Sequence, residues 1–220
     1  MHKTKDDIIA ATAEHVQLLL RGEGSGHDWW HIYRVWHNAK HIAASEPEAN
    51  TFVVELAALL HDIGDHKFHN GDETVGPRLA KEWLDQFGLP ASTVNHVVTI
   101  IQEISFKGAG TSSAMSTEEG CIVQDADRLD AIGAVGIART FAFGGHKSRQ
   151  LYDPAIEPVL HTSFEAYKAS TAPTINHFYE KLLLLKDRMH TKTARKIAEK
   201  RHQYMEEFLR KFFAEWEGLE

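Results

Sequence analysis

Apolar residues recur at three- and four-residue spacings along most of the chain, which is the pattern of amphipathic α-helices. The predicted helices cover, with approximate bounds, residues 4–22, 28–44, 48–62, 75–87, 92–103, 116–143, 163–187 and 191–217. No segment alternates apolar and polar residues as a half-buried strand does, and the valine pairs at 53–54 and 97–98 lie within helical periodicity. The sequence therefore predicts an all-α protein.

Local signals set the expected ends of these helices. Two capping boxes mark predicted starts, Thr4 with Asp7 and Ser116 with Glu119. The second opens a long predicted helix that continues to Phe143, and Gly144-Gly145 is expected to end it. Residues 144–160 then lack any periodicity, so we predict a long loop, a feature that is often functional in compact domains.

Length and composition indicate one helical domain. The 220 residues fit a single domain spanning 1–220, with a core at about 25–145 and a C-terminal helical extension at about 160–217. Hydrophobic residues (43%) and charged residues (25%) are close to the globular average, which permits a sizeable core. The amphipathic last helix is expected either to close this core or to form the seam of a homodimer.

Several features favour a cytoplasmic protein that contacts neither membrane nor nucleic acid. No apolar run approaches the ~20 residues of a membrane helix, and the N-terminus lacks the apolar stretch of a signal peptide. The single cysteine, Cys121, cannot form an internal disulfide. The net charge of −7 disfavours nucleic-acid binding but permits a small phosphorylated substrate, because a bound metal supplies local positive charge.

A histidine and an aspartate stand together after an apolar run. His61-Asp62 follows residues 56–60, all of them Leu or Ala, so the pair lies at the end of a buried helix. An imidazole and a carboxylate are costly there unless something pairs with them, as a metal ion would. Such dipeptides also occur by chance, and His27-Asp28 is a second one, so His61-Asp62 alone would be interpreted as a capping or surface pair.

Two further residues change this interpretation. His31 lies on the preceding predicted helix and Asp127 on a later one. Two imidazoles and two carboxylates from three helices suit a divalent ion: manganese is our first choice, and magnesium, iron, nickel, cobalt or zinc are alternatives. Four protein ligands leave two positions of a six-coordinate ion for water and a phosphate oxygen.

The ordered set His31, His61-Asp62 and Asp127 resembles that of the HD-domain phosphohydrolases. Residues 61–68, 124–134 and 136–139 resemble a bacterial subgroup of small HD hydrolases, and 177–189 and 201–208 resemble its tail, so the resemblance covers about residues 25–215. It implies a helical bundle of the HD type and a metal held by His31, His61, Asp62 and Asp127. Some members of that subgroup cleave nucleotides to a monophosphate and pyrophosphate.

The leading hypothesis is therefore metal-dependent hydrolysis of a nucleoside or deoxynucleoside triphosphate to monophosphate and pyrophosphate. An alarmone or cyclic-nucleotide phosphodiesterase would use the same site. A non-catalytic nucleotide-binding regulatory module is the alternative from another class, and it would be expected to have lost ligands. A di-iron oxygenase needs more ligands than these four, and no nucleophile-elbow, Walker or His-Glu-x-x-His motif occurs.

Three residues near the ligands are candidates for acid–base chemistry. Asp65 and His66 directly follow the histidine–aspartate pair, and Asp130 lies one helical turn after Asp127. The alternative interpretation of Asp65 is a turn residue beside Gly64. The alternative for Asp130 is a salt bridge to Arg34 or Arg128.

Five residues are candidates for substrate binding: Arg34, Lys67, Lys147, Arg149 and Tyr152. Arg34 shares a helix face with His31, and the last three lie in the predicted loop, where cations and an aromatic ring would serve a phosphate and a base. The alternatives are a structural ion pair for Arg34 and solvated side chains for the others. Trp29 and Trp30 are candidates for a base pocket, although aromatic residues at a helix start more often pack in the core.

Overall fold

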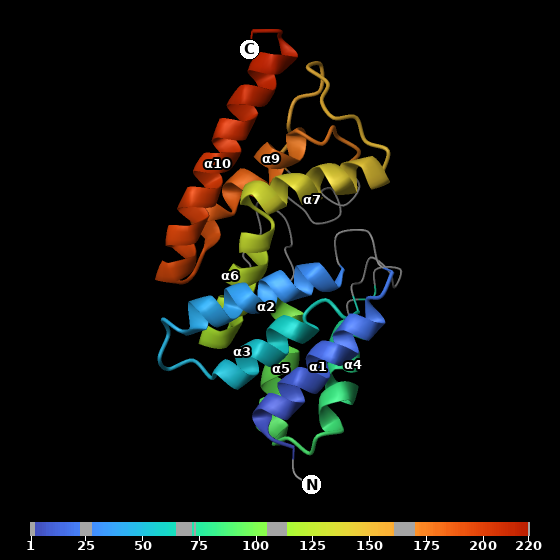
Figure 1. Ribbon diagram of the computed structural model, residues 1–220, viewed down its shortest axis with the longest axis vertical. Coiled ribbons are helices and arrows are strands. Elements are labelled where there is room, and N and C mark those ends of the chain that lie inside the picture. The colour runs from blue at the N-terminus through green and yellow to red at the C-terminus, as the bar shows by residue number, and fades with distance from the viewer. Residues whose placement is uncertain are drawn as a thin grey trace. The chain divides into compact units, whose positions relative to one another are not determined.

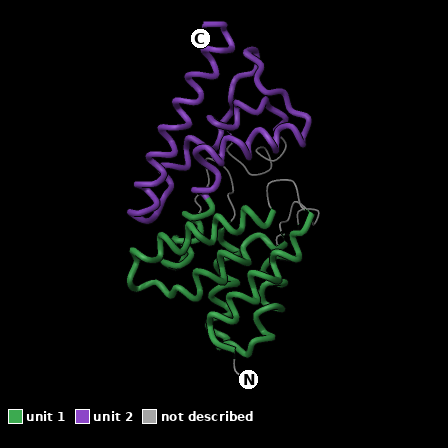
Figure 2. The backbone as a smooth tube through the Cα atoms, viewed as in Figure 1, with its two compact units in different colours: residues 1–106, 113–127 green, residues 107–112, 128–220 purple. Residues whose placement is uncertain are grey.

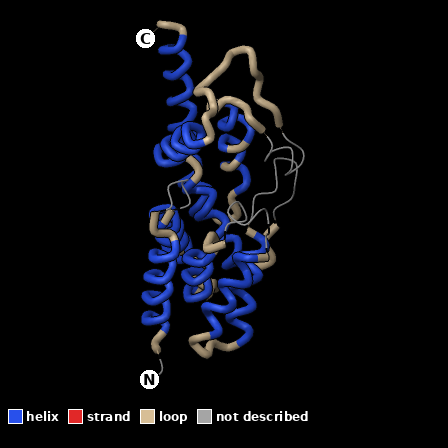
Figure 3. The backbone as a smooth tube through the Cα atoms, turned by 90° about the vertical axis from the view of Figure 1, so that its right-hand side faces the viewer, coloured by secondary structure: helices blue, strands red, loops and turns tan. Residues whose placement is uncertain are grey.

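The computed structural model describes residues 3–22, 28–64, 72, 74–104, 114–160 and 170–219. These residues form helices joined by loops, with no strand among them, so the predicted all-α class is confirmed (Figures 1 and 3). The α-helices are α1 (Lys5–Leu19), α2 (Trp29–Ala43), α3 (Thr51–Leu60), α4 (Val75–Asp85), α5 (Ala91–Glu103), α6 (Glu118–Asp130), α7 (Gly133–His146), α9 (Asn176–Glu180) and α10 (Lys192–Trp216). Two 3₁₀ helices, η2 (Leu182–Leu184) and η3 (Lys186–Arg188), precede α10.

The chain divides into two compact units (Figure 2). Unit 1 comprises residues 1–106 and 113–127, and unit 2 comprises residues 107–112 and 128–220. Helix α6 contributes to both, because the division falls between Asp127 and Arg128. In the described part of either unit, no helix is both long and apolar enough to cross a membrane.

Helix α3 forms the centre of unit 1. It packs against α1, α2 and α5, and eight of its 10 residues are apolar and buried, which is typical of a central helix. Glu55 is the only acidic residue of α3, and its carboxylate accepts a hydrogen bond of 2.9 Å from the Trp36 indole of α2. The packing of α3 therefore fixes the position of its C-terminal end, from which His61 follows.

Unit 2 is built on the packing of α10 against α7. Phe141 of α7, Phe178 of α9 and Phe208 of α10 form a cluster of rings with centroids 5.8–6.2 Å apart. Helix α10 agrees with the predicted helix at 191–217, and Thr191 caps it by accepting a hydrogen bond from the backbone N–H of Ala194.

The long helix predicted at 116–143 is wrong, because it is two helices. Helix α6 ends at Asp130 and α7 begins at Gly133, whose φ of +77° suits only glycine. A Cβ at Gly133 would also lie 2.9 Å from the Arg201 side chain of α10. The predicted stop at Gly144-Gly145 is wrong as well, since α7 continues to His146. Glycine costs only about 1 kcal/mol inside a helix, and the packing of α7 offsets it.

Two other predicted boundaries have different outcomes. The Thr4–Asp7 capping box is confirmed, with both reciprocal hydrogen bonds present. The Ser116–Glu119 box is wrong, because Thr117 accepts the hydrogen bond from the backbone N–H of Gly120. Ser116 instead donates to the carboxylate of Glu103 on α5.

The helix predicted at 163–187 is wrong over its described part. Residues 170–175 are not helical, and α9, η2 and η3 follow as short separate pieces. Pro173 lies inside the predicted segment, where it removes a backbone donor and disfavours helical geometry in the residue before it.

Candidate metal centre

His31 is held in the first turn of α2. Asp28 is the N-cap of that helix, and its carboxylate accepts a hydrogen bond of 2.9 Å from the backbone N–H of His31. The imidazole is 1% exposed, so it faces the interior of unit 1. The sequence Asp28-x-x-His31 thus fixes the start of the helix and places His31 in its first turn.

His61 follows α3 directly and is similarly buried. Its Nδ1 lies 2.9 Å from the backbone carbonyl oxygen of Ala58. Because a carbonyl only accepts, Nδ1 carries the proton of the neutral ring, and Nε2 presents a lone pair. Metal-binding histidines are usually oriented in this way by a hydrogen bond from the other ring nitrogen.

The turn after His61 is locked by a close backbone approach. A Cβ at Gly64 would lie 2.7 Å from the backbone nitrogen of Gly76, near the start of α4. Only glycine permits this contact. This close approach holds the turn at residues 61–64 against the start of α4.

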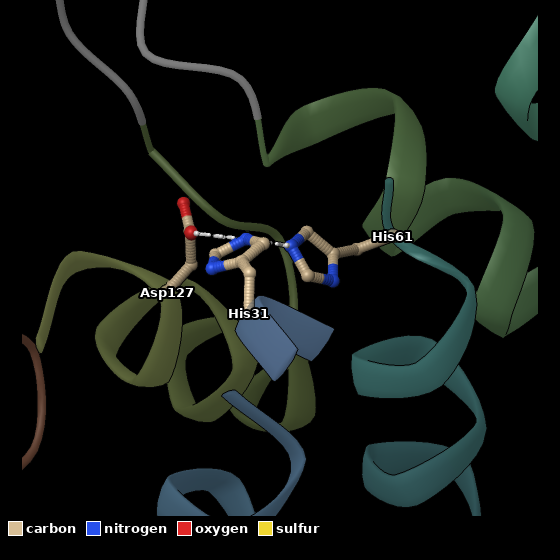
Figure 4. A group of neighbouring side chains, drawn as sticks. All are labelled: His31, His61 and Asp127. Carbon is tan, nitrogen blue, oxygen red and sulfur yellow. Dashed lines mark hydrogen bonds and ion pairs between the residues drawn. The ribbon is translucent and has the colours of Figure 1, made fainter. Parts of the chain in front are cut away.

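The two imidazoles and the carboxylate of Asp127 converge (Figure 4). The His31 Nε2 atom lies 3.3 Å from His61 Nε2 and 3.5 Å from Asp127 Oδ1, and His61 Nε2 lies 3.9 Å from the same oxygen. The three side chains come from α2, the end of α3 and α6, as predicted from the sequence.

This spacing fits a divalent ion. Ligand atoms about 2.1 Å from a common ion lie roughly 3.0 Å apart at right angles and roughly 3.4 Å apart in a tetrahedron. The observed separation of 3.3 Å lies inside this range, that of 3.5 Å is about 0.1 Å beyond it, and that of 3.9 Å is about 0.5 Å beyond it. Two imidazole nitrogens and one carboxylate oxygen form a donor set that suits first-row divalent ions.

Asp62 approaches the same group from one side. Its Oδ2 lies 3.6 Å from His31 Nε2, and the side chain is 17% exposed. The compact three-residue group does not include it. Its role as a fourth ligand stays a prediction.

Of the predicted acid–base residues, the structure describes only Asp130. Asp65 and His66, together with the predicted substrate residue Lys67, lie outside the described residues. Asp130 is buried in unit 2, where its carboxylate accepts a 2.6 Å hydrogen bond from the Arg139 guanidinium of α7. This contact favours the structural interpretation of Asp130, with Arg139 as a partner that the sequence analysis did not name.

The predicted substrate residues also have identifiable surroundings. Arg34 is half-buried on α2, three residues after His31. In unit 2, Arg149 donates a 2.6 Å hydrogen bond to the backbone carbonyl of Ser170, and the exposed Lys147 lies over the Phe143 ring. The Tyr152 ring contacts the rings of Phe212, Phe213 and Trp216 on α10. Tyr152 thereby ties the 147–160 loop to α10, and its role in substrate binding stays a prediction.

Helix α6 is anchored near both ends by contacts that the sequence did not predict. Glu119 accepts a 2.9 Å hydrogen bond from the backbone N–H of Asn50, the N-cap of α3, and lies 3.4 Å from His96 of α5. At the other end of α6, Arg201 donates to the carbonyl of Leu129. Burial lowers the pKa of Arg201, and the nearby Asp130 opposes that shift. No spacing in the sequence pairs these residues, because each contact joins segments distant in the chain.

The geometry and the sequence agree with one family. A sequence model of the HD domain matches residues 29–132, which contain all four predicted ligands. The chain belongs to the HD-domain family.

Within that family, the chain is similar over nearly its whole length to YpgQ of Bacillus subtilis (strain 168). The two are 42% identical over 210 residues, which cover 93% of this chain and 92% of YpgQ. A crystal structure of YpgQ in complex with ADP superposes with a TM-score of 0.72, at 37% identity, over 94% of this chain and 100% of that one.

Two other solved structures are also similar. An HD-superfamily hydrolase from Bacillus thuringiensis is 43% identical, with a TM-score of 0.76 over 98% of this chain and 100% of that one. A protein of Lactobacillus plantarum is 36% identical, with a TM-score of 0.85 over 97% of this chain and 99% of that one.

Proposed function

We propose that this protein is a metal-dependent phosphohydrolase that cleaves a nucleoside or deoxynucleoside triphosphate to the monophosphate and pyrophosphate. The observation that carries the proposal is the convergence of His31, His61 and Asp127 in one group, in which both imidazoles are buried. The ADP bound to YpgQ supports a nucleotide as the ligand, since the two chains are similar over nearly their whole length.

The proposed ligands are His31, His61, Asp62 and Asp127, with Mn²⁺ as the first choice of ion. When bound, a divalent ion supplies a nucleophilic hydroxide at neutral pH and polarises a phosphoryl oxygen. The two carboxylates balance the charge of the ion. The protein holds the His61 ring in the tautomer that leaves Nε2 free to act as a ligand, through the hydrogen bond to Ala58.

In the proposed reaction, water attacks the α-phosphorus and a new phosphorus–oxygen bond forms. The bond between the α-phosphorus and the α,β-bridging oxygen breaks, and pyrophosphate leaves with that oxygen. Asp65 and His66 are proposed to accept and donate the protons. Arg34, Lys67, Lys147 and Arg149 are proposed to meet the phosphates.

The test is a product analysis on protein stripped of metal and reloaded with Mn²⁺. It would be incubated with the eight common ribo- and deoxyribonucleoside triphosphates, with an alarmone and a cyclic dinucleotide in parallel, in water enriched in ¹⁸O. The proposal predicts metal-dependent monophosphate that carries ¹⁸O and pyrophosphate that does not. Label in pyrophosphate would place the attack at the β-phosphorus and overturn the proposed bond.

A matched pair of aspartates provides the control. Asp127→Ala should lower turnover by at least about 10²-fold, whereas Asp85→Ala, an exposed aspartate of α4, should leave it unchanged. Cleavage of only the alarmone or the cyclic nucleotide would keep the metal site and reject the triphosphate. No turnover of any compound, with Mn²⁺ shown to be bound, would reject the proposed activity.

A further inference from the structure

Helix α3 receives part of its N-terminal cap from another helix. In the capping box of α1, the Asp7 carboxylate accepts a 2.9 Å hydrogen bond from the backbone N–H of Thr4, the N-cap of the same helix. The corresponding position of α3 is Val53, which has no acceptor, and the side chain of the N-cap Asn50 makes no capping hydrogen bond. The carboxylate of Glu119, on α6, takes this role by accepting a 2.9 Å hydrogen bond from the Asn50 N–H.

The Glu119 carboxylate lies where the first turn of α6 reaches both α3 and α5. Its Oε1 accepts from Asn50, its Oε2 lies 3.4 Å from the Nε2 atom of His96 on α5, and the side chain is only 12% exposed. The next residue, Gly120, keeps α6 close to α5, since a Cβ there would lie 3.5 Å from the Ile100 side chain. The acceptor that caps α3 is therefore enclosed by neighbouring helices and is not a freely moving surface carboxylate.

The same two helices carry two of the three converging ligand residues at their other ends. His61 directly follows α3, whose 10 residues span about 15 Å. Asp127 lies about 12 Å along α6 from Glu119, at 1.5 Å per residue. Both helices thus run from the Glu119 contact towards the metal centre, where His61 Nε2 and Asp127 Oδ1 are 3.9 Å apart.

This separation leaves little room for movement of α6. Two atoms that each lie about 2.1 Å from one ion cannot be more than about 4.2 Å apart. An outward displacement of Asp127 by more than about 0.3 Å would therefore prevent His61 and Asp127 from binding the same ion without a further rearrangement. His31 depends less on α6, because α2 packs directly against α3.

We propose that Glu119 is a positioning residue of the metal centre: by capping α3 from α6, it fixes the distance between His61 and Asp127. When this hydrogen bond is broken, α6 gains freedom relative to α3. Part of the binding free energy of the ion is then used to restore the ligand separation, so the ion binds more weakly. The hydrogen bond and the ion hold the same pair of helices together at opposite ends.

This inference rests on the proposed metal ligands but not on the proposed reaction, so its test measures the binding of Mn²⁺ alone, by electron paramagnetic resonance titration. Glu119→Ala removes the acceptor and should weaken Mn²⁺ binding roughly 5-fold, the contribution of one ordinary hydrogen bond. Glu119→Gln keeps an acceptor oxygen and should restore the affinity to within about 2-fold of the wild type. Asp7→Ala removes the equivalent hydrogen bond within α1, which carries no proposed ligand, and is the matched control that should not change Mn²⁺ binding.

The donor side of the hydrogen bond provides a second pair of variants. Asn50→Pro removes the backbone N–H at a residue whose φ of −75° suits proline, and should weaken Mn²⁺ binding as much as Glu119→Ala. Asn50→Ala keeps the N–H and should bind Mn²⁺ like the wild type.

The wild-type protein offers a test that needs no substitution. Because coupling between two sites is reciprocal, Mn²⁺ should strengthen the hydrogen bond by the factor by which the hydrogen bond strengthens Mn²⁺ binding. Saturating Mn²⁺ should therefore slow hydrogen exchange of the Asn50 amide by roughly 5-fold. The Thr4 amide, which donates to Asp7 within α1, is the internal control and should not be slowed.

The outcomes separate this proposal from the proposed function. If Glu119→Ala unfolded at lower urea but bound Mn²⁺ as tightly as the wild type, Glu119 would be a structural cap only, and the positioning role would be overturned. Glu119→Gln as weak as Glu119→Ala, or equal slowing of the Asn50 and Thr4 amides, would overturn it as well. The predicted Mn²⁺ pattern, with no triphosphate cleaved, would support the positioning role while rejecting the proposed hydrolysis.

Discussion

Two carboxylates on α6, one helical turn apart, have opposite surroundings. Asp127 is 38% exposed and faces the two buried imidazoles of His31 and His61. Asp130 is 2% exposed and is paired with the Arg139 guanidinium at 2.6 Å. The residue type and the helix are the same, but the exposure of the side chain and its partners differ.

The surroundings of each carboxylate determine whether it is suited to hold an ion. A guanidinium already neutralises Asp130 and fixes its geometry, so a cation would have to displace Arg139. The Nε2 atom of His61 offers a lone pair, and Asp127 offers a negative charge. The interactions described above pair neither group with an arginine or lysine, in contrast to Asp130 with Arg139. We therefore expect Asp127 to bind the metal and Asp130 to stabilise the fold.

Substitution of Asp127 has the largest expected effect. Asp127→Asn keeps the shape of the side chain but removes the charge, and should lower metal-dependent hydrolysis by at least about 10²-fold. The unfolding free energy of the metal-free protein should change by less than about 1 kcal/mol, because the carboxylate is more than one-third exposed. Steady-state kinetics and urea unfolding measure the two quantities. Asp85→Asn is the control. If Asp127→Asn lost stability to an extent that explained its loss of activity, Asp127 would have a structural role like that of Asp130.

Substitution of Asp130 should show the reverse pattern. Asp130→Asn should lower the unfolding free energy by about 2–3 kcal/mol, because it leaves the Arg139 guanidinium beside a neutral partner in a largely buried place. Turnover per folded molecule should stay within about 3-fold of the wild type. A strong loss of activity in a stable Asp130→Asn protein would restore Asp130 as an acid–base candidate.

An exposed ion pair sharpens this second prediction. Lys81 and Asp85 lie at the same 2.6 Å, but both side chains are 52% exposed. Double-mutant cycles should give a coupling above about 1 kcal/mol for Asp130 with Arg139, and below about 0.5 kcal/mol for Lys81 with Asp85. Equal couplings would show that burial does not separate the two pairs.

A third histidine extends the comparison to unit 2. Burial, with Lys181 and Arg149 nearby, lowers the pKa of His177 to about 3. Its unfolded-state pKa is near 6.5, so the unfolded chain takes up a proton that the folded chain does not, and stability should fall as the pH drops from about 6.5 toward 3. Urea unfolding of metal-free protein at pH 7.5 and pH 5 should show a smaller loss for His177→Gln than for the wild type. His146→Gln, at an exposed position of α7, should lose as much as the wild type.

The smallest expected effect concerns a part of unit 1 remote from these charges in sequence. Thr4→Ala removes the side-chain half of the Thr4–Asp7 capping box of α1 and should cost about 1 kcal/mol of unfolding free energy. Activity should not change. Ser92→Ala, an exposed substitution in α5, is the control. An effect of Thr4→Ala on turnover would link α1 to the site.

Local signals in the sequence were sufficient for most of unit 1. The apolar run of α3 predicted a buried helix, and its end places His61 at the site. The order of His31, His61 and Asp127 was also enough to predict that three helices bring them together, because helix periodicity and the family resemblance agree on it.

Other features depended on contacts that no local pattern contains. The break between α6 and α7 needs a positive φ at Gly133 and room for Arg201, which is about 70 residues away in sequence. Tyr152 was predicted to bind substrate because it is an aromatic residue beside two cations in the loop, and no local pattern could show that its ring also packs on α10.

The most direct test of the central claim is a count of bound Mn²⁺ by electron paramagnetic resonance and elemental analysis. Metal-free wild-type protein, His61→Ala and the control His146→Ala would each be titrated with Mn²⁺ and checked for helical content by circular dichroism. We expect one tightly bound Mn²⁺ ion per chain in the wild type and in His146→Ala. His61→Ala should keep its helical content but lose that ion. Retention of the ion by His61→Ala, or its absence from the wild type, would contradict the assignment of this group as the metal centre.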